Sequence, residues 1–386
     1  MIENRSFMQH FFIIGGGSLQ VKFINKVKAN GYIAHVFDYN PACEGRQYAD
    51  YFHLLSIDDI KGIYEVALQY HPIAIQTVAT EMGNVTACAV GEKLGLRNNS
   101  FETALNTTDK SRMKKIFTAN NIRSAKAVEL YQDSDLTKPP FEFPFVVKAS
   151  DRSASRGVTF VENQQQYECA FVDALNESHN KIVLAEEYLQ GQQYSVETIS
   201  NDGEHHIVAV TEENTDGIPN FVETHHLMPA RISDEMYDGL KDFVFNVLDA
   251  FKIKYGAGHI ELKYHNGEWA VIEIASRMGG WRDEMAELSM GIDYLQLIID
   301  SSVKDKKINI CPLYRKYAVV RTILNTKDWQ QYIELKNKYG SNLSYDYVEY
   351  QHSDFHAKTL MQSQGRYYLV TEDCRLVEEF MKRENE

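Results

Sequence analysis

The sequence predicts a mixed α/β and α+β protein, in which an N-terminal doubly wound domain precedes a central α+β region and a small C-terminal piece. Strand and helix signals alternate over the first hundred residues, as is typical of a parallel sheet covered by helices. Further along, strands come closer together and are joined by turn-forming sequences such as SNDGE and YHNGE. The 386 residues, 44% of them hydrophobic, are expected to form more than one globular unit.

Each N-terminal element follows from its own pattern. FFII is a short apolar strand, GGG is a turn, and residues 19–31 show the periodicity of an amphipathic helix that ends at a glycine. Further strands are expected at residues 32–40 and 72–80, with a helix over 57–70 between them. This βαβ order supports the doubly wound domain, to which we assign residues 1–107.

The rest of the chain is assigned to a central domain and a C-terminal domain. TDKSRMKKIFTAN, residues 108–120, predicts a helix with an N-capping Thr or Asp, and FVVKAS is a strand after a proline-rich break. ISDEMYDGLKDFVFNVLDAFKI is a long amphipathic helix, and YAVVRTIL, GRYYLVTE and one closing helix complete the chain. The expected domains are residues 108–305, divided into a small lobe (108–185) and a large lobe (186–305), and residues 306–386.

Composition excludes several classes of protein. The net charge of -14 argues against nucleic acid as a main partner, because phosphate backbones need a basic field. No run of eighteen apolar residues predicts a membrane span, and the first apolar run is too short for a signal peptide. The cysteines are scattered singly, without a disulfide framework or zinc spacing, and this favours a cytoplasmic protein.

The first candidate for chemistry is the glycine-rich turn IIGGGS. Such a turn before a helix can hold a phosphate with backbone N–H groups, and Asp38 ends the next strand, as in a dinucleotide site. The third glycine of that fingerprint is replaced by Gln20, so a tight structural turn is the favoured interpretation.

Two further segments suit a nucleotide. In KASDRSASRGVTFV, Lys148 ends an apolar strand and a small polar loop follows, which can cover a triphosphate or be an ordinary hairpin. In VLAEEYLQGQQYSVETI, two strands meet at Gly191, and such a hinge can offer one donor and one acceptor to a planar base.

The pair Glu261 and Glu273 lies on two apolar strands joined by an NG turn. In an antiparallel hairpin the two carboxylates can lie side by side, and like charges there are unfavourable unless something neutralises them. A hard divalent cation with oxygen ligands, such as Mg²⁺, is the usual neutraliser. Two solvent-facing glutamates on a surface hairpin are the alternative.

In this order, the segments resemble the ATP-grasp superfamily of carboxylate–amine ligases over essentially the whole chain. The ordered set is DK at 109–110, FPFVVKAS, the loop SDRSASRGV, the hinge EEYLQGQQYSVE and the two glutamates. TEENTDGIPNFVETHHLMPA and EIASRMGG are most similar to the L-amino acid ligase branch. The resemblance implies an ATP-grasp fold with a pre-ATP-grasp domain, a two-part ATP-binding domain and a small C-terminal domain.

The resemblance also implies roles for individual residues. Residues expected to bind ATP are Lys110, Lys148, Ser153, Ser155, Gly157, Glu186, Glu187, Leu189 and Gln193. Glu261 and Glu273 would carry Mg²⁺, with Mn²⁺ as an alternative. Substrate-binding residues would be Glu223, His226, Arg277, Gly279 and Gly280, and Arg277 and His226 are the catalytic candidates. A structural histidine and a surface glutamate are the competing interpretations of the E-x-x-H motif.

Two positions depart from the family pattern. Gln193 stands where many relatives have a ribose-binding Glu, and it can still hydrogen-bond a hydroxyl without the charge. Ala275 stands where many relatives have the Asn of E-x-N, which argues against an Asn-assisted second metal contact, although Glu273 itself could bridge two ions. Neither change abolishes the expected chemistry.

The implied reaction joins a small-molecule carboxylate to an amine, one of them an amino acid. The carboxylate would take the γ-phosphate of ATP, and the amine would attack the resulting acyl phosphate to give an amide or peptide bond, ADP and phosphate. Trp281, Arg282 and Asp283 are candidates to line the acceptor pocket. A homodimer is common among similar ligases. The alternatives are a nicotinamide-dependent oxidoreductase using the glycine-rich turn, and a non-catalytic ATP-binding regulator.

Overall fold

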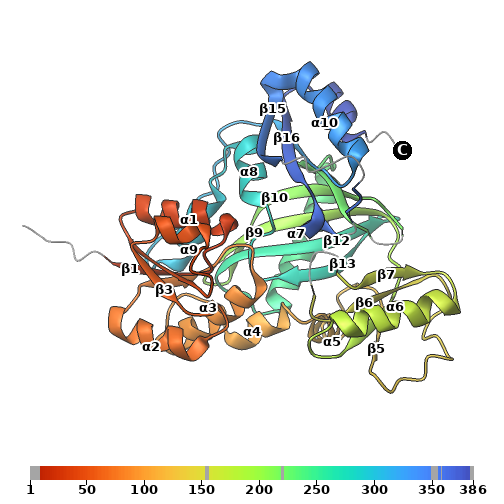
Figure 1. Cartoon of the computed structure of the whole chain (residues 1–386), viewed down its shortest axis with the longest axis horizontal. Helices are drawn as coiled ribbons and strands as arrows, with labels where there is room; N and C mark the ends of the chain where they lie inside the picture. The colour runs from red at the N-terminus through yellow and green to blue at the C-terminus, as the bar shows by residue number, and fades with distance from the viewer. Residues whose placement is uncertain (1–8, 153–155, 219–220, 349–354, 358, 383–386) are drawn as a thin grey trace, which may run out of the picture.

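The computed structural model describes residues 9–152, 156–218, 221–348, 355–357 and 359–382, whose strands form three sheets (Figure 1). A four-stranded parallel sheet lies at the N-terminal end, a second four-stranded sheet forms a separate lobe, and an eight-stranded sheet lies between them. The layered arrangement confirms the expected combination of α/β and α+β architecture.

The N-terminal sheet is buried on both faces. Its strand order is β3-β2-β1-β4, all parallel. Alternate residues of β1 enter two cores: Phe11 and Ile13 pack with α1 on one face, and Phe12 and Ile14 pack with α2 and α3 on the other. The elements are β1 (His10–Ile14), α1 (Ser18–Ala29), β2 (Ile33–Asp38), β3 (Tyr51–Leu54), α2 (Ile60–Tyr70), β4 (Ala74–Gln76) and α3 (Glu81–Leu94), with a 3-10 turn, η1 (Glu44–Tyr48).

A short helical segment leads from this domain to the next. It consists of α4 (Phe101–Asn106) and α5 (Lys110–Ala119). The Asp109 side chain accepts hydrogen bonds from the amides of Ser111 and Arg112, which confirms an N-cap at this position. The amide of Lys110 donates to the Ser150 carbonyl at 2.8 Å, so the start of α5 is fastened to the end of strand β6.

The small lobe is an antiparallel sheet of order β5-β8-β6-β7 with one long helix on it. Phe145 and Val147 point to the same face, where they pack against Tyr167 of α6. The elements are β5 (Ala127–Leu130), β6 (Phe145–Ala149), β7 (Val158–Val161), α6 (Gln164–Glu177) and β8 (Val183–Glu187).

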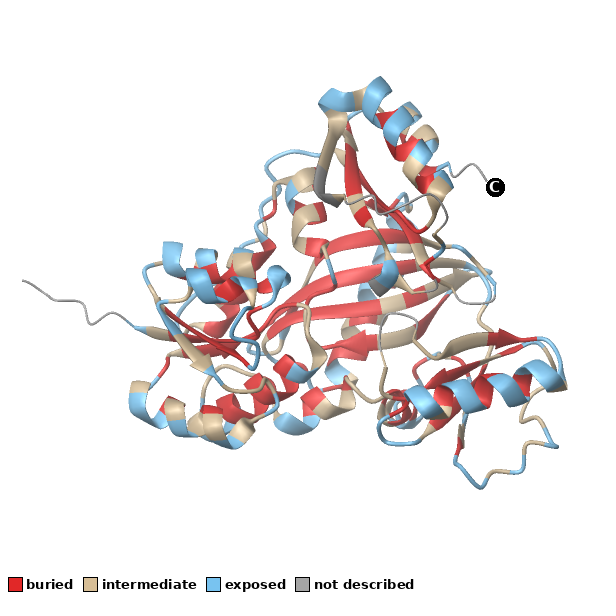
Figure 2. Ribbon diagram, viewed as in Figure 1, coloured by how far each residue is buried: buried red, intermediate tan, exposed pale blue. Residues whose placement is uncertain are grey.

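The eight-stranded sheet has the order β13-β12-β9-β10-β11-β14-β16-β15 and is antiparallel throughout. Much of this central sheet is buried in Figure 2, while the outer faces of the surrounding helices are exposed. Its strands are β9 (Gln192–Asn201), β10 (Glu204–Thr215), β11 (Glu223–Met228), β12 (Gly256–His265), β13 (Glu268–Ala275), β14 (Tyr317–Thr322), β15 (Leu343–Val348) and β16 (Gly365–Thr371).

Three strands from the C-terminal segment continue this sheet, through pairing of β11 with β14. Strands on both sides of residue 306 therefore belong to one continuous sheet. The remaining helical elements are α7 (Asp234–Ala250), α8 (Arg282–Met290), α9 (Tyr294–Ser302), α10 (Thr326–Tyr339), η2 (Gly340–Asn342), η3 (Leu360–Gln362) and α11 (Cys374–Met381). Across the described part of the chain, no helix combines the length and apolarity that crossing a bilayer requires.

Candidate active site

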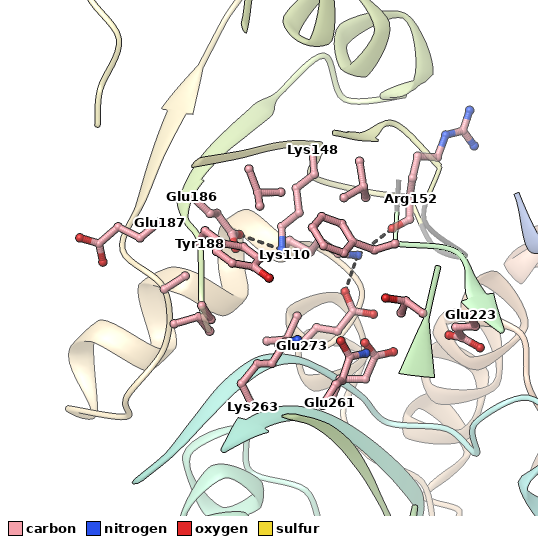
Figure 3. A pocket seen from close by; sticks show the side chains of 18 residues that line it. Lys110, Lys148, Arg152, Glu186, Glu187, Tyr188, Glu223, Glu261, Lys263 and Glu273 are labelled. Atoms are coloured by element: carbon pink, nitrogen blue, oxygen red, sulfur yellow. Dashed lines mark hydrogen bonds and ion pairs between the residues drawn. The ribbon is translucent and has the colours of Figure 1, made fainter. Parts of the chain in front are cut away.

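A cavity of about 160 Å³ lies between the small lobe and the edge of the eight-stranded sheet (Figure 3). It opens where the ends of β6 and β8 face β12 and β13, so each sheet supplies one wall. Its lining residues are Lys110, Ala125, Val146, Lys148, Arg152, Val158, Glu186, Glu187, Tyr188, Leu189, Gln193, Thr215, Phe221, Glu223, Glu261, Lys263, Ile272 and Glu273. Nine of the residues expected to bind ATP, metal or substrate thus meet around one space.

Two lysines from different elements point into the cavity. Lys148 is the penultimate residue of β6, and its Nζ lies 2.9 Å from a carboxylate oxygen of Glu186 on β8. Lys110 begins α5, and its Nζ lies 2.9 Å from Glu273 Oε2 and donates to the Arg152 carbonyl at 2.7 Å. Both lysines are at least nine-tenths buried, so their charges act in a medium that screens them weakly.

The two candidate metal carboxylates lie directly opposite each other on neighbouring strands. Glu261 of β12 pairs in register with Glu273 of β13. Burial and the charge of Glu273 raise the pKa of Glu261 to about 7. Burial also acts to raise the pKa of Glu273, but Lys110 and Lys148 outweigh it and hold that pKa at about 2. Glu261 has a long contact of 3.4 Å with Nε2 of His259, which lowers its pKa but does not offset burial and the charge of Glu273.

These carboxylates fit a hard divalent cation. Both offer oxygen ligands to the cavity, and a cation bound between them would offset the burial and the repulsion from Glu273 that raise the pKa of Glu261. Among the described residues, no group of three or more His, Cys, Asp and Glu side chains could hold a metal ion. The protein would thus supply few ligands, as suits Mg²⁺ completed by phosphates and water.

The hinge residues have contacts of their own. The Glu186 carboxylate lies between Lys148 and Lys114, and the Glu187 amide donates to the Lys126 carbonyl at 3.0 Å in the β5–β8 pairing. Glu186, Glu187 and Leu189 all line the cavity, and adenine binding by this hinge stays a prediction.

The loop between β6 and β7 is described in part. Ser153 and Ser155 lie outside the described residues. Gly157 has a φ of +66°, and its carbonyl accepts from the Ala149 amide at 3.1 Å. A glycine is favoured here because the left-handed conformation is costly for residues with a Cβ. Gly157 is not among the residues that line the cavity.

A second group of charges lies on the same face of the large sheet and is neutralised internally. Glu197 is fully buried; it contacts His259 Nδ1 at 2.5 Å and accepts from the Gly279 amide at 3.0 Å. Burial acts to lower the pKa of His259, but Glu197 outweighs it and raises that pKa to about 10. Arg282 forms an ion pair with Glu213, which also accepts from Gln193 at 2.9 Å.

The E-x-x-H motif forms an internal pair. Glu223 lines the cavity, and its Oε2 lies 3.1 Å from Nε2 of the fully buried His226. The other ring nitrogen of His226, Nδ1, is buried without a hydrogen-bond partner. This geometry places Glu223 between the nucleotide cavity and the histidine, and the substrate role of both residues stays a prediction.

Arg277 and the double glycine have specific internal contacts. Arg277 forms an ion pair with Glu81, at the start of α3 in the N-terminal domain, and donates to the Met278 carbonyl at 2.9 Å. A Cβ on Gly279 would come within 2.6 Å of both Glu197 and His259, so this glycine allows the buried acid–imidazole contact. Gly280 has open space around it. The Gly279 amide is therefore used inside the protein.

The backbone groups of Gly16, in the glycine-rich turn, form hydrogen bonds within the protein. The Gly16 amide donates to Asp38 Oδ2 at 2.8 Å, and the Gly45 amide donates to the Gly16 carbonyl at 2.7 Å. A Cβ on Gly16 would lie 2.6 Å from Cys43 Sγ. Asp38 and the turn are thus engaged locally, which agrees with a tight structural turn and gives no support to a nicotinamide site.

The sequence interpretation missed nine of the lining residues, and four of these carry charged or aromatic side chains: Arg152, Tyr188, Phe221 and Lys263. Lys263 could have been predicted from the sequence, because it follows Glu261 by two residues and alternate residues of a strand point to the same face of the sheet. Tyr188 and Phe221 form a stacked aromatic pair, with ring centroids 6.0 Å apart, which joins the hinge to the segment before β11. That contact joins two segments that are distant in the sequence, so it had no local signal.

Residues 141–284 match the family model of the ATP-grasp domain. Alanine–anticapsin ligase of Bacillus subtilis is 28% identical over 268 residues, which cover 62% of this chain and 56% of that protein. The match thus spans little more than half the length of that relative. The L-arginine-specific L-amino acid ligase of Bacillus subtilis is 23% identical over 309 residues, covering 76% of this chain and 75% of that protein.

Solved structures share the fold over nearly the whole chain. L-amino acid ligase from Bacillus licheniformis has a TM-score of 0.75 at 18% identity, covering 96% of this chain and 95% of that one. N5-carboxyaminoimidazole synthetase from Staphylococcus aureus complexed with ADP has a TM-score of 0.77 at 18% identity, covering 97% and 96%. The chain therefore has the ATP-grasp fold, and part of it, residues 141–284, is similar to the ATP-grasp domain model.

Proposed function

We propose that the protein is an ATP-dependent carboxylate–amine ligase that releases ADP and phosphate and uses an amino acid as one substrate. The observation that carries this proposal is the cavity, in which Lys110 and Lys148 face Glu261 and Glu273 across the gap between two sheets. The L-amino acid ligases among the relatives support the amino acid as a substrate.

The two lysines are placed to hold the anionic phosphates of ATP. Lys148 lies on the small-lobe side of the cavity and Lys110 forms an ion pair with Glu273, so a triphosphate would bind beside both ammonium groups and next to the carboxylates of β12 and β13. Phosphoryl transfer is accelerated mainly by positioning and by offsetting charge on the transferring group, which these residues can do without a protein nucleophile.

Glu261 and Glu273 would hold Mg²⁺, or Mn²⁺, together with phosphate oxygens. When bound, the cation would offset negative charge on the phosphoryl group that is transferred. The same two carboxylates would fix where the phosphates lie along β12 and β13.

The chemistry balances without a covalent enzyme intermediate. A substrate carboxylate oxygen attacks the γ-phosphorus, the bond to the ADP oxygen breaks, and an acyl phosphate forms. The amine then attacks the acyl carbon, loses a proton and expels phosphate, leaving an amide. Arg277 is proposed to stabilise the oxyanion of this second step, and its ion pair with Glu81 would fix its orientation.

The proposal is tested by pooled substrates. Purified protein is incubated with ATP, Mg²⁺ and mixtures of amino acids and other carboxylates, and phosphate and nucleotide products are measured. We expect release of ADP and phosphate that requires both a carboxylate and an amine. Formation of AMP and pyrophosphate, or nucleotide turnover independent of both substrates, would contradict the proposal. The cytoplasmic location and the homodimer stay predictions.

A further inference from the structure

Helix α5 carries two lysines one turn apart, and each contacts a glutamate on a different wall of the cavity. Lys110 and Lys114 are four residues apart and therefore lie on the same face of the helix. Lys110 reaches across to Glu273 on the large sheet, at 2.9 Å. Lys114 reaches back to Glu186 on the small lobe, with its Nζ 3.1 Å from Oε2. One helix thus contacts an acid on each wall.

Glu186 is shared between two ammonium groups. Its Oε1 lies 2.9 Å from Lys148 and its Oε2 lies 3.1 Å from Lys114. Lys148 and Glu186 line the cavity, whereas Lys114 is not among the lining residues and contacts Glu186 from behind. Side chains of all three residues are at most 10% exposed, so each contact is shielded from water.

This cluster carries an excess of one positive charge. Two ammonium groups share one carboxylate, and a phosphate in the cavity would complete the charge balance. Burial, followed by the charge of Lys148, lowers the pKa of Lys114 to about 8, although Glu186 acts in the opposite direction. The charged groups that face Lys114 are Glu186, Lys148 and, at longer range, Glu273.

We propose that Lys114 is a positioning residue of the nucleotide site: by holding one oxygen of Glu186, it keeps the ammonium group of Lys148 aimed at the phosphates of ATP. Without Lys114, both oxygens of Glu186 are available to Lys148 alone. The resulting closed ion pair draws Lys148 away from an incoming phosphate and removes the excess positive charge. The inference deepens the proposed function, since it rests on ATP binding in this cavity.

The primary test compares three variants on α5. Lys114→Met removes the ammonium but keeps most of the aliphatic stem, Lys114→Arg keeps the charge, and Lys115→Met is the matched control. Lys115 lies on the same helix but is exposed and pairs with Glu129 instead. Affinity for ATP with Mg²⁺ is measured by calorimetry on full-length protein without carboxylate or amine substrates, and folding is checked by thermal melting.

We expect Lys114→Met to weaken ATP binding about tenfold, the effect of losing one charge-assisted contact. Lys114→Arg should bind within about threefold of wild type, and Lys115→Met should be unchanged within error. ATP binding by Lys114→Met within twofold of wild type would overturn the inference, and so would an equal loss in Lys115→Met.

The pH profile separates positioning through charge from a packing role. ATP is an anion, so it favours the protonated form of Lys114, and wild-type affinity should fall as pH rises above about 8. Lys114→Arg stays protonated throughout and should show a flat profile between pH 7.5 and 9.5. An identical fall in wild type and Lys114→Arg would overturn the inference.

The outcomes also separate this inference from the proposed ligase activity. If ATP binding changes as expected but no substrate pair yields ADP, the inference stands and the ligase proposal fails. If ADP and phosphate are released in a substrate-dependent manner but Lys114→Met binds ATP normally, the ligase proposal stands and the inference fails. Failure of wild-type protein to bind ATP would overturn both.

Discussion

Two pairs of glutamates lie on the same face of the eight-stranded sheet, but their charges are balanced in different ways. Glu197 and Glu213 are matched inside the sheet by a histidine, an arginine and a glycine amide. Glu273 forms an ion pair with Lys110 of α5, whereas Glu261 has only a 3.4 Å contact with His259, a residue that Glu197 already holds. The charges of the first pair are thus neutralised by the protein, whereas those of the second pair are neutralised in part and leave room for a cation. The comparison distinguishes acids that build the sheet from acids that are placed to bind.

The largest expected effect comes from breaking the compensated pair. Glu213→Ala leaves Arg282 as a buried charge without its main partner, and we expect the free energy of unfolding to fall by about 3–5 kcal/mol. Urea denaturation measures the change. Glu204→Ala, at an exposed position on the same strand, is the control and should change stability by at most about 0.5 kcal/mol. Equal effects in both variants would contradict the distinction.

Breaking the open pair should cost activity more than stability. Glu273→Ala removes an expected metal ligand, so we expect substrate-dependent ADP release to fall at least about 100-fold, or about 2.7 kcal/mol in activation free energy. The free energy of unfolding should fall by about 1–3 kcal/mol, because Lys110 loses its buried partner while Glu261 loses a repelling neighbour. Glu268→Ala, on the exposed part of the same strand, is the control. Wild-type ADP release in folded Glu273→Ala would refute the metal site.

A further test adds a carboxylate next to Glu213, whose charge the protein already neutralises. Gln193→Glu places a second carboxylate beside Glu213, where the wild-type amide donates a hydrogen bond at 2.9 Å. We expect a loss of about 1–3 kcal/mol in unfolding free energy, because a buried acceptor then faces another acceptor. Gln192→Glu, one residue earlier, is a useful comparison because its amide donates to backbone carbonyls instead. A more stable Gln193→Glu protein would show that Glu213 tolerates a second charge.

The smallest effect is the response to a metal. With ADP present, Mg²⁺ at ten times its dissociation constant should stabilise the wild-type protein by about 1.4 kcal/mol, seen as a rise in melting temperature. The double variant Glu261→Gln/Glu273→Gln should lose this increment, whereas Glu213→Gln should keep it. A Mg²⁺-dependent increment that survives in the double variant would assign the metal to other ligands.

Local sequence patterns predicted most of the fold. The strand FFII, the helix over residues 232–253 and the N-cap at Asp109 are set by periodicity and by a short side chain at a helix start, and the structure confirms each of them. The C-terminal segment was expected as a small domain, and its strands extend the central sheet through the pairing of β11 with β14. Which strand pairs with which depends on long-range packing, which local patterns do not encode.

The candidate site was also predicted only in part, because local motifs reveal some of its residues and long-range packing supplies the others. Lys110, Lys148, Glu261 and Glu273 belong to recognisable local motifs, and the structure places all four around one cavity. Their catalytic and binding roles stay predictions. The role of Lys114 was not visible, because its partner Glu186 follows 72 residues later and neither residue marks the other locally.

By itself, the sequence determined the order of strands and helices, the paired acids on one hairpin and the lysines at the ends of their elements. These properties depend on spacing along the chain, which periodicity and turn chemistry control. The tertiary structure decided which charges are neutralised. Arg277, expected beside a reaction intermediate, meets Glu81 from another domain, and Gly279 closes over Glu197. Such pairings depend on how the sheets pack against each other. A buried charge without a partner has a high free-energy cost, so the folded structure must bring an opposite charge or a hydrogen-bond donor next to it.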